Sequence, residues 1–329
     1  MLTKKKLNDL RKNFRGQKIA VIGDMMLDSY FRGDVKRVSP EAPVPVVEVE
    51  NEFFRFGGAA NVALNILKLG GIPLPAGVIG NDNDGKIFTS LLEEANMMSD
   101  GIIVDSSRPT TAKTRVIAGN QHVVRIDKES KESISNNTEK KLLEYLASNI
   151  FSLDGIILED YNKGVLTKSF IKNIISLANK KDMFITVDPK FNNFFEYKNV
   201  TVFKPNKKEA EDVLGIKIKN KEDVTKAGRT MLERLNAENV LLTLGSEGIA
   251  VFEKNKTEKR LATKARKVAD VSGAGDTVIS TLTMALVAGA DIMDASYLAN
   301  YAAGIVCGEV GIVPIEIEKL IEAVGKENK

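Results

Sequence analysis

The segment Asp270-Val271-Ser272-Gly273-Ala274-Gly275-Asp276 combines a glycine-rich turn with a carboxylate, and the apolar run at 277–290 that follows it predicts a buried helix. A glycine-rich turn that opens a helix presents bare backbone N–H groups and the positive end of the helix dipole, a site for an anion, most often phosphate. Asp276 could accept a proton from a substrate hydroxyl while those N–H groups stabilise a transferring phosphoryl group. The alternative is a tight turn with an acidic residue in the first helical turn.

Polar or glycine residues follow several predicted strands at the point where each strand ends. Strands are predicted at 18–23, 155–158, 184–187, 200–203 and 240–244, and they precede Asp24, Asp160, Asp188, Asn206 and Gly245. Helices are predicted between them, at 59–69, 86–96, 138–149, 167–180 and 207–214. This alternation predicts an α/β fold with a mostly parallel sheet covered by helices on both faces. Ligands bind at the carboxyl edge of such a sheet.

The segment at 29–56 has a different character. Pro40, Pro43 and Pro45 exclude a helix there and favour extended chain. Residues 112–126 predict a hairpin that turns at Ala118-Gly119-Asn120. We therefore predict a small β clasp, or lid, built from short strands within about 28–56 and 112–127. Its apolar positions need cover, which a second subunit would supply, so we expect a homodimer.

Composition limits the class of protein. The 329 residues carry a net charge of +3, which gives no reason to expect a nucleic-acid partner. No signal-peptide pattern and no apolar run of membrane-spanning length occur, so we expect a cytoplasmic protein with no membrane partner. Cys307 is the only cysteine, interpreted as a buried structural thiol, and His122 is the only histidine. Sites that need two histidines are thus excluded, and neither the P-loop nor the dinucleotide fingerprint is present.

Two signatures together resemble those of the ribokinase-like, or PfkB, carbohydrate kinases: Gly57-Gly58-Ala59-Ala60-Asn61 with Gly70, and the Asp270–Asp276 segment. The resemblance runs from Lys18 to about Pro314. It implies one ribokinase-like kinase domain over 1–329, with a three-layer α/β/α architecture. The stretches 23–28, 37–47, 57–63, 115–121 and 125–127 look like the heptose 7-phosphate kinases of lipopolysaccharide precursor synthesis. These occur alone or fused to an adenylyltransferase, whose two-histidine motif His122 alone cannot form, so we expect the kinase part only.

The resemblance implies transfer of phosphate from ATP to C1 of D-glycero-D-manno-heptose 7-phosphate. Asp276 matches the catalytic base, and Gly273, Ala274 and Gly275 match the anion hole. Asn206 and Glu209 match an Asn-x-x-Glu motif associated with Mg²⁺ and phosphates; a helix cap with its capping-box glutamate is the alternative, and both can hold. Thr243, Gly245 and Gly248 match the stretch beside the adenine nucleotide. Many members also bind a monovalent cation such as K⁺, which Asp270 could help to frame.

On the sugar side, Asp28, Gly57, Gly58 and Asn61 match positions that contact the sugar, although turn or helix-cap chemistry would also explain Asp28 and Asn61. Asp160 and Lys163 lie in a segment similar to the Asp-Tyr-x-Lys-Gly of this group and would line the cleft, with a surface salt bridge as the alternative. The substrate phosphate needs cations. The candidates are Arg37, Lys113, Arg115 and Arg125, because the clasp should overhang the sugar; solvated surface arginines are the alternative.

Two other functions stay open at this stage. The first is the same chemistry on another phosphosugar, a sugar or a nucleoside. The second is a sugar-phosphate sensor that keeps the fold without catalysis. The intact Gly273-Ala274-Gly275-Asp276 segment and the Asn206–Glu209 motif favour an enzyme.

Overall fold

The computed structural model describes residues 2–119, 121–265, 268–309 and 311–327. Within these ranges a nine-stranded sheet has the order β13-β12-β11-β10-β9-β8-β1-β4-β5. Its strands are β1 (Lys18–Gly23), β4 (Ile72–Ile79), β5 (Ile102–Val104), β8 (Gly155–Glu159), β9 (Phe184–Asp188), β10 (Val202–Phe203), β11 (Asn239–Thr243), β12 (Ile249–Glu253) and β13 (Lys259–Leu261). The run from β11 to β5 is parallel, and only the edge strands β12 and β13 are antiparallel.

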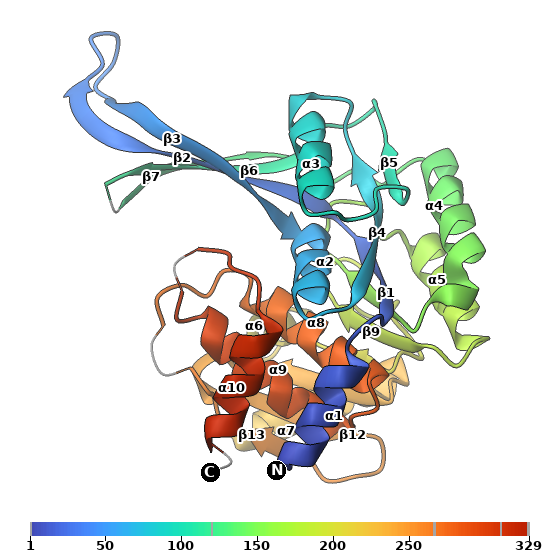
Figure 1. Cartoon of the computed structure of the whole chain (residues 1–329). Helices are drawn as coiled ribbons and strands as arrows, with labels where there is room; N and C mark the ends of the chain where they lie inside the picture. The colour runs from blue at the N-terminus through green and yellow to red at the C-terminus, as the bar shows by residue number, and fades with distance from the viewer. Residues whose placement is uncertain (1, 120, 266–267, 310, 328–329) are drawn as a thin grey trace.

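Helices cover both faces of this sheet, so the molecule has three layers (Figure 1). One hydrophobic core holds side chains of α1 (Lys4–Asn13), α2 (Ala59–Lys68), α3 (Asn83–Glu94), α8 (Ala274–Val287), α9 (Ile292–Val306) and α10 (Ile317–Glu327). The other holds side chains of α4 (Asn136–Asn149), α5 (Lys168–Asn179), α6 (Lys207–Leu214) and α7 (Lys221–Leu235). Within β1, Val21 belongs to the first core and Ala20 and Ile22 to the second, as the two-residue repeat of a strand requires. The predicted α/β fold class is confirmed.

A second sheet stands off this body, and we call it the clasp. It has the order β3-β2-β6-β7 and consists of β2 (Met25–Val38), β3 (Pro45–Gly58), β6 (Thr111–Ala118) and β7 (Gln121–Lys128). The prediction of short strands was wrong, because β2 and β3 each span 14 residues and form one long ribbon (Figure 1). Pro40 and Pro43 lie in the connection, and Pro45 begins β3, where a missing N–H is tolerated. Asn120, in the predicted hairpin turn, lies outside the described residues.

No helix among the described residues combines the length and the apolar character needed to cross a lipid bilayer. The longest ones, α7 and α9, have 15 residues each and pack against the central sheet or α8.

Candidate active site

The turn before α8 lies at the carboxyl edge of the central sheet. The helix starts at Ala274, three residues earlier than predicted, so that Gly273 is the N-cap and Asp276 falls in the first turn. Gly273 has φ +78°, a left-handed conformation that favours glycine. A Cβ there would lie 3.2 Å from both Asn61 Nδ2 and Ile312 Cγ2, so a side chain would crowd this turn. The Ala274 amide donates to the Val271 carbonyl at 3.2 Å, which shapes the turn around its own backbone.

Asp276 is buried, with 4% of its surface exposed, yet it lines the cavity beside the turn. Asn61 Nδ2 donates to Oδ2 at 2.6 Å, and the Tyr161 hydroxyl donates to Oδ1 at 2.9 Å. Burial raises the pKa of Asp276 to about 6; the nearby Asp188 adds to the rise, while the two hydrogen bonds oppose it. The carboxyl group is therefore more basic than an ordinary aspartate but still ionised at neutral pH, which suits a general base.

A cavity of about 770 Å³ opens beside Asp276. Most of the residues predicted for the nucleotide line it: Asn206, Thr243, Gly245, Gly248, Gly273, Ala274 and Gly275. Cys307, buried at the C-cap of α9, lines the same cavity. The volume lies within the usual range of about 300–1,000 Å³ for ligand pockets. The structure thus brings the predicted anion-binding turn, the carboxylate and the predicted nucleotide residues to one cavity.

Two lysines reach this cavity from neighbouring strand ends. Lys204 follows β10, and its Nζ lies 2.8 Å from Asp188 Oδ2; Lys190 follows β9 and is paired with Glu209. Burial would lower the pKa of each lysine, but the carboxylates around them outweigh it and raise the pKa above its ordinary value. Both lysines therefore keep their charge where phosphate groups would lie.

A third carboxyl group lies behind these residues. Glu159, at the end of β8, has no exposed surface, and oxygens of Glu159, Asp188 and Asp276 lie within 4.8 Å of one another. Among the described residues neither Glu159 oxygen has a hydrogen-bond partner. Burial raises the pKa of Glu159 well above its ordinary value, and the negative charges of Asp188 and Asp276 raise it further. Asp276 and Asp188 each have donors, whereas Glu159 has none in the described part of the chain, so burial disfavours the charged form of Glu159.

Asn206 and Glu209 form the capping box of α6. The backbone N–H of Glu209 donates to Asn206 Oδ1 at 2.9 Å, and the backbone N–H of Asn206 donates to Glu209 Oε2 at 2.8 Å. Asn206 also lines the cavity. Glu209 does not line it but is paired with Lys190, which does. The helix-cap alternative is therefore present, and Asn206 lines the cavity at the same time.

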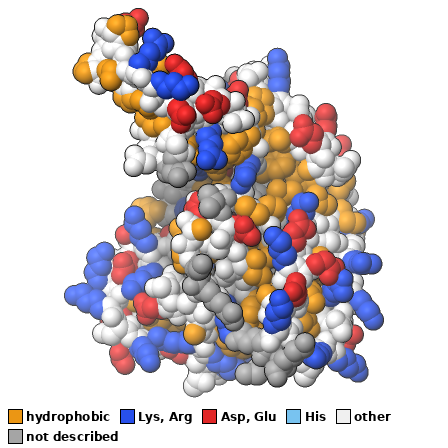
Figure 2. All heavy atoms as spheres, turned by 60° about the vertical axis from the view of Figure 1, so that its left-hand side comes forward, with side chains coloured by type: hydrophobic (Ala, Val, Ile, Leu, Met, Phe, Trp, Pro, Cys, Tyr) orange, Lys and Arg blue, Asp and Glu red, His pale blue; other side chains and the backbone are white. Residues whose placement is uncertain are grey.

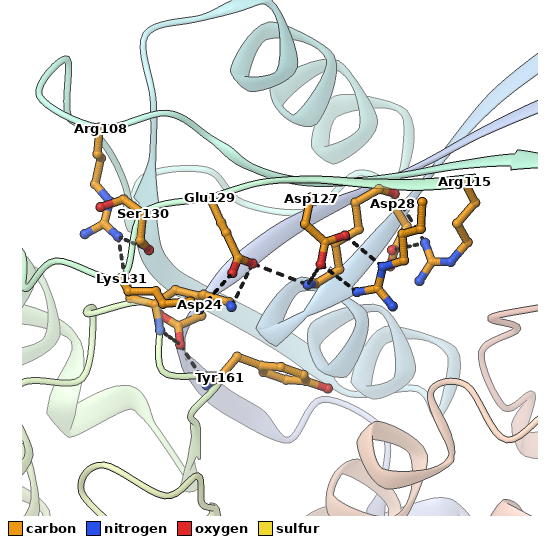
Figure 3. A network of polar contacts seen from close by, with 12 residues as sticks. Asp24, Asp28, Arg108, Arg115, Asp127, Glu129, Ser130, Lys131 and Tyr161 are labelled. Atoms are coloured by element: carbon orange, nitrogen blue, oxygen red, sulfur yellow. Dashed lines mark hydrogen bonds and ion pairs between the residues drawn. The ribbon is translucent and has the colours of Figure 1, made fainter. Parts of the chain in front are cut away.

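Among the residues predicted to contact the sugar, Asp28 of β2 is 2% exposed and lies beside Gly57 of β3. A Cβ on Gly57 would lie 2.4 Å from Asp28 Oδ2, so only glycine leaves this carboxylate its place. Arg115 of β6 pairs with the Asp28 carboxylate (Figure 3). Its guanidinium lies 5.1 Å from the centre of the Tyr30 ring. Gly58, with φ +55°, ends the strand at the start of α2, the helix that carries Asn61.

Two other predicted cations of the clasp, Lys113 and Arg125, lie in a row of ion pairs together with Lys163. Lys113 lies 3.5 Å from both Asp127 and Glu129, and Lys163 lies 2.7 Å from Glu129. Arg125 is paired with Asp127 at 2.7 Å. Figure 3 shows the carboxylates of this row between Asp28 and the 130–131 segment. Lys163 thus makes the salt bridge considered as its alternative.

Arg37 is not part of this group. It lies near the far end of β2, nine residues beyond Asp28. At about 3.3 Å per residue the two positions are roughly 30 Å apart along the strand. The structure therefore separates Arg37 from the other candidates for the substrate phosphate within one chain.

Asp160 does not line the cavity. Its carboxylate accepts hydrogen bonds from the Tyr197 hydroxyl at 2.6 Å and from the backbone N–H of Asn162 at 2.7 Å. Asp24 has a similar structural role, because its carboxylate accepts hydrogen bonds from the backbone N–H groups of Tyr161 at 2.7 Å and Lys163 at 3.0 Å. Both aspartates hold the 160–165 loop in the shape that brings the Tyr161 hydroxyl to Asp276.

Sequence reasoning assigned no role to four residues of the site: Tyr161, Glu159, Lys190 and Lys204. The last two carry a usable signal, since Asp188-Pro189-Lys190 and Lys204-Pro205-Asn206 each follow a strand at the ligand-binding edge. Tyr161 also directly follows Asp160, which the sequence predicts to line the cleft. Glu159 has no such signal, because a glutamate that ends a strand is more often at the surface.

The model of the pfkB family carbohydrate kinases matches residues 16–318, nearly the whole chain. The chain belongs to the pfkB family of carbohydrate kinases. The protein is therefore a carbohydrate kinase, the class of enzyme that the sequence predicts.

Curated relatives narrow the comparison. The bifunctional protein HldE of Syntrophotalea carbinolica is 41% identical over 303 residues, which cover 92% of this chain and 62% of that protein. HldE of Geobacter sulfurreducens is 40% identical, with 93% and 62% covered, and HldE of Helicobacter pylori is 41% identical, with 92% and 65% covered. The chain thus spans less than two thirds of the length of these relatives.

Solved structures confirm the fold. The ribokinase of Arabidopsis thaliana complexed with ribose and ATP superposes with a TM-score of 0.73 at 18% identity, covering 94% of this chain and 99% of that one. Phosphofructokinase-2 of Escherichia coli in complex with potassium gives 0.76 at 19% identity, covering 96% and 100%. The ribokinase-like architecture is therefore shared by this pfkB-family chain.

Proposed function

We propose that this protein transfers the γ-phosphate of ATP to the C1 hydroxyl of D-glycero-D-manno-heptose 7-phosphate, giving the 1,7-bisphosphate for nucleotide-activated heptose synthesis in the cytoplasm. The observation that carries the chemistry is Asp276, buried beside the Gly273 turn and open to the cavity. The choice of heptose 7-phosphate is supported by the sequence stretches that look like heptose 7-phosphate kinases and by about 41% identity to HldE proteins.

In this proposal Asp276 removes the proton of the C1 hydroxyl while that oxygen forms a bond to the γ-phosphorus of ATP. The bond between the γ-phosphorus and the bridging oxygen of ADP breaks, and ADP carries away the electron pair. Amides of the Gly273–Gly275 turn and the ammonium groups of Lys190 and Lys204 offset the charge on the phosphoryl oxygens. Tyr161 and Asn61 hold the carboxylate in place.

The Asn206–Glu209 pair fits an indirect role toward Mg²⁺. The Asn206 oxygen accepts the Glu209 amide, and the Glu209 carboxylate is shared between Lys190 and the Asn206 amide. Because Mg²⁺ usually keeps several of its waters, these oxygens would hold the ion through them, and the ion would neutralise charge on the ATP phosphates. K⁺ near Asp270 stays a prediction; the Asp270 carboxylate accepts from the amides of Ser272 and Gly311.

We also propose that the clasp acts as the lid of one kinase domain over 1–329, and that it pairs with a second copy in a homodimer. Exposed apolar side chains gather on the clasp, from Val35, Val38, Val49, Phe53, Val123, Val124 and Ile126 (Figure 2). A patch of this kind on a projecting ribbon needs cover.

A substrate panel tests the function. Purified protein is given Mg²⁺-ATP with heptose 7-phosphate, fructose 6-phosphate, ribose or a nucleoside, and ADP release and the position of the new phosphate are measured. We expect kcat/KM for heptose 7-phosphate to exceed the others by at least about 100-fold. A better rate with another acceptor identifies a different kinase of the family. Absence of ADP release with every acceptor favours a sensor.

A further inference from the structure

Arg55 joins the clasp to the body of the molecule. It lies on β3, and its guanidinium carbon is 5.8 Å from the centre of the Tyr30 ring and 5.4 Å from that of Phe53. These two rings stack on each other with 4.7 Å between their centroids. Arg55 Nη1 donates to the carbonyl oxygen of Ile312 at 2.5 Å. The charged end of a clasp residue is thus held by aromatic rings on its own sheet and bonded to the backbone of another part of the chain.

The segment that Arg55 holds lies directly against the anion-binding turn. The Ile312 side chain faces Gly273, so that a Cβ on Gly273 would lie 3.2 Å from Ile312 Cγ2. The Gly311 amide donates to Asp270 Oδ2 at 3.2 Å, and Asp270 Oδ1 accepts from the Ser272 amide at 2.9 Å. Residues 311–312 therefore contact Asp270 and Gly273, the residues that lead into the predicted phosphate donors.

Arg55 also lies beside the clasp residues that are predicted to contact the sugar. In the β2–β3 register Arg55 pairs with Asp28, and Gly57 follows it by two residues. Asp28 in turn binds Arg115, whose guanidinium lies on the same Tyr30 ring as that of Arg55. A ligand that orders Asp28 and Arg115 would thus also fix the stack from which Arg55 reaches Ile312.

We propose that Arg55 is a positioning residue that couples sugar binding at the clasp to the shape of the Gly273–Gly275 turn. The Ile312 carbonyl is the connecting point, since its residue packs against Gly273 on one side and accepts Arg55 on the other. Bound sugar holds the clasp strands, Arg55 holds residues 311–312, and these hold the turn ready for the γ-phosphate. The proposal rests on the proposed kinase function.

The test is a measurement of linkage. Titration calorimetry gives the Kd of a non-hydrolysable ATP analogue with and without a saturating amount of the sugar that the panel identifies as the acceptor. For the native chain we expect sugar to tighten analogue binding at least fivefold, the lower end of usual coupling between sites. In Arg55→Met, which keeps an apolar stem but has no donor, that ratio should fall to about one and kcat should fall at least tenfold.

Two variants sharpen the result. Arg55→Lys keeps one charged donor and should recover part of the coupling. Arg32→Met removes an exposed arginine from β2 of the same clasp and should behave as the native chain. A coupling ratio that stays unchanged in Arg55→Met, or a native ratio of one, overturns the proposal. The proposal also fails if Arg55→Met binds the sugar alone and the ATP analogue alone more weakly and melts at a lower temperature, because this pattern marks a purely structural role. If the native chain phosphorylates no acceptor, the proposed function fails instead.

Discussion

The two sheets of this molecule are held in different ways. Strands of the central sheet are covered on both faces, and residues such as Val21 and Ile157 have no exposed surface. On the clasp, by contrast, Val38 is 62% exposed and Ile126 54%. Close packing fixes the central sheet in one arrangement. The inner end of the clasp is packed as well, since Met25 and Phe56 belong to the same hydrophobic core, but its outer part is exposed, and Arg115 and Arg55 add polar contacts within the clasp and to Ile312. In the proposed function Asp276, the base, therefore lies on the closely packed, rigid part, and selection of the sugar falls to the clasp.

The largest expected effect comes from the rigid part. Asp276→Asn keeps the shape of the side chain but removes the proton acceptor, and general bases of this kind contribute about 10²–10⁴-fold. We expect kcat to fall by about 10³-fold, while the Kd for an ATP analogue and the melting temperature change little. Steady-state kinetics, calorimetry and a thermal melt check this together. A variant with near-native kcat would exclude Asp276 as the base.

A substitution in the clasp should change a different kinetic constant, the KM for the phosphosugar. Arg115→Ala removes a charge-assisted contact worth about 1.5–3 kcal/mol beside Asp28, which corresponds to about 10–100-fold in affinity. We therefore expect KM for the phosphosugar to rise by that factor and KM for ATP to stay within about twofold. Arg32→Ala, an exposed position on the same sheet, is the matched control. Equal changes in both KM values would remove Arg115 from the sugar site.

The pH profile probes the rigid part again, with a smaller change. The pKa of Asp276 is raised to about 6, mainly by burial, and the base works only when ionised. As the pH falls through 6 the carboxylate takes up a proton, so kcat/KM should decline, approaching about tenfold per pH unit below that value. The profile is measured between pH 4.5 and 8 on protein shown to stay folded by circular dichroism. An activity that holds constant down to pH 4.5 would contradict the raised pKa.

The sequence predicts the rigid half well for a physical reason. The Gly273–Asp276 turn and the Asn206–Glu209 box are each formed within four consecutive residues, so their chemistry is visible in the order of the chain. The strand ends that carry them meet because parallel strands share a carboxyl edge. The fold class follows from the same alternation and is confirmed. The roles given to these residues stay predictions until they are tested.

Tertiary contacts set the limits of that prediction. Lys204 and Asp188 are 16 positions apart, and only the pairing of β9 with β10 brings them to 2.8 Å. The charge of Glu159 depends on burial, which the sequence did not reveal. In the clasp, the length of β2 decides that Arg37 lies far from Asp28, and a prediction of short strands could not place it. The exposed ribbon was thus harder to predict than the buried sheet.

The smallest effect on catalysis should come from the outer surface of the clasp. Val124 and Ile126 lie two residues apart on β7, on one face, and are 47% and 54% exposed. Replacing both by glutamate puts like charges opposite each other in the proposed dimer, so association should weaken while kcat changes less than about threefold. Light scattering after size exclusion, over a dilution series, gives the mass. Val104→Glu, at a 55% exposed valine on β5 of the central sheet, is the control. A native chain that is monomeric at every concentration, or a double variant that still dimerises, would refute pairing through the clasp.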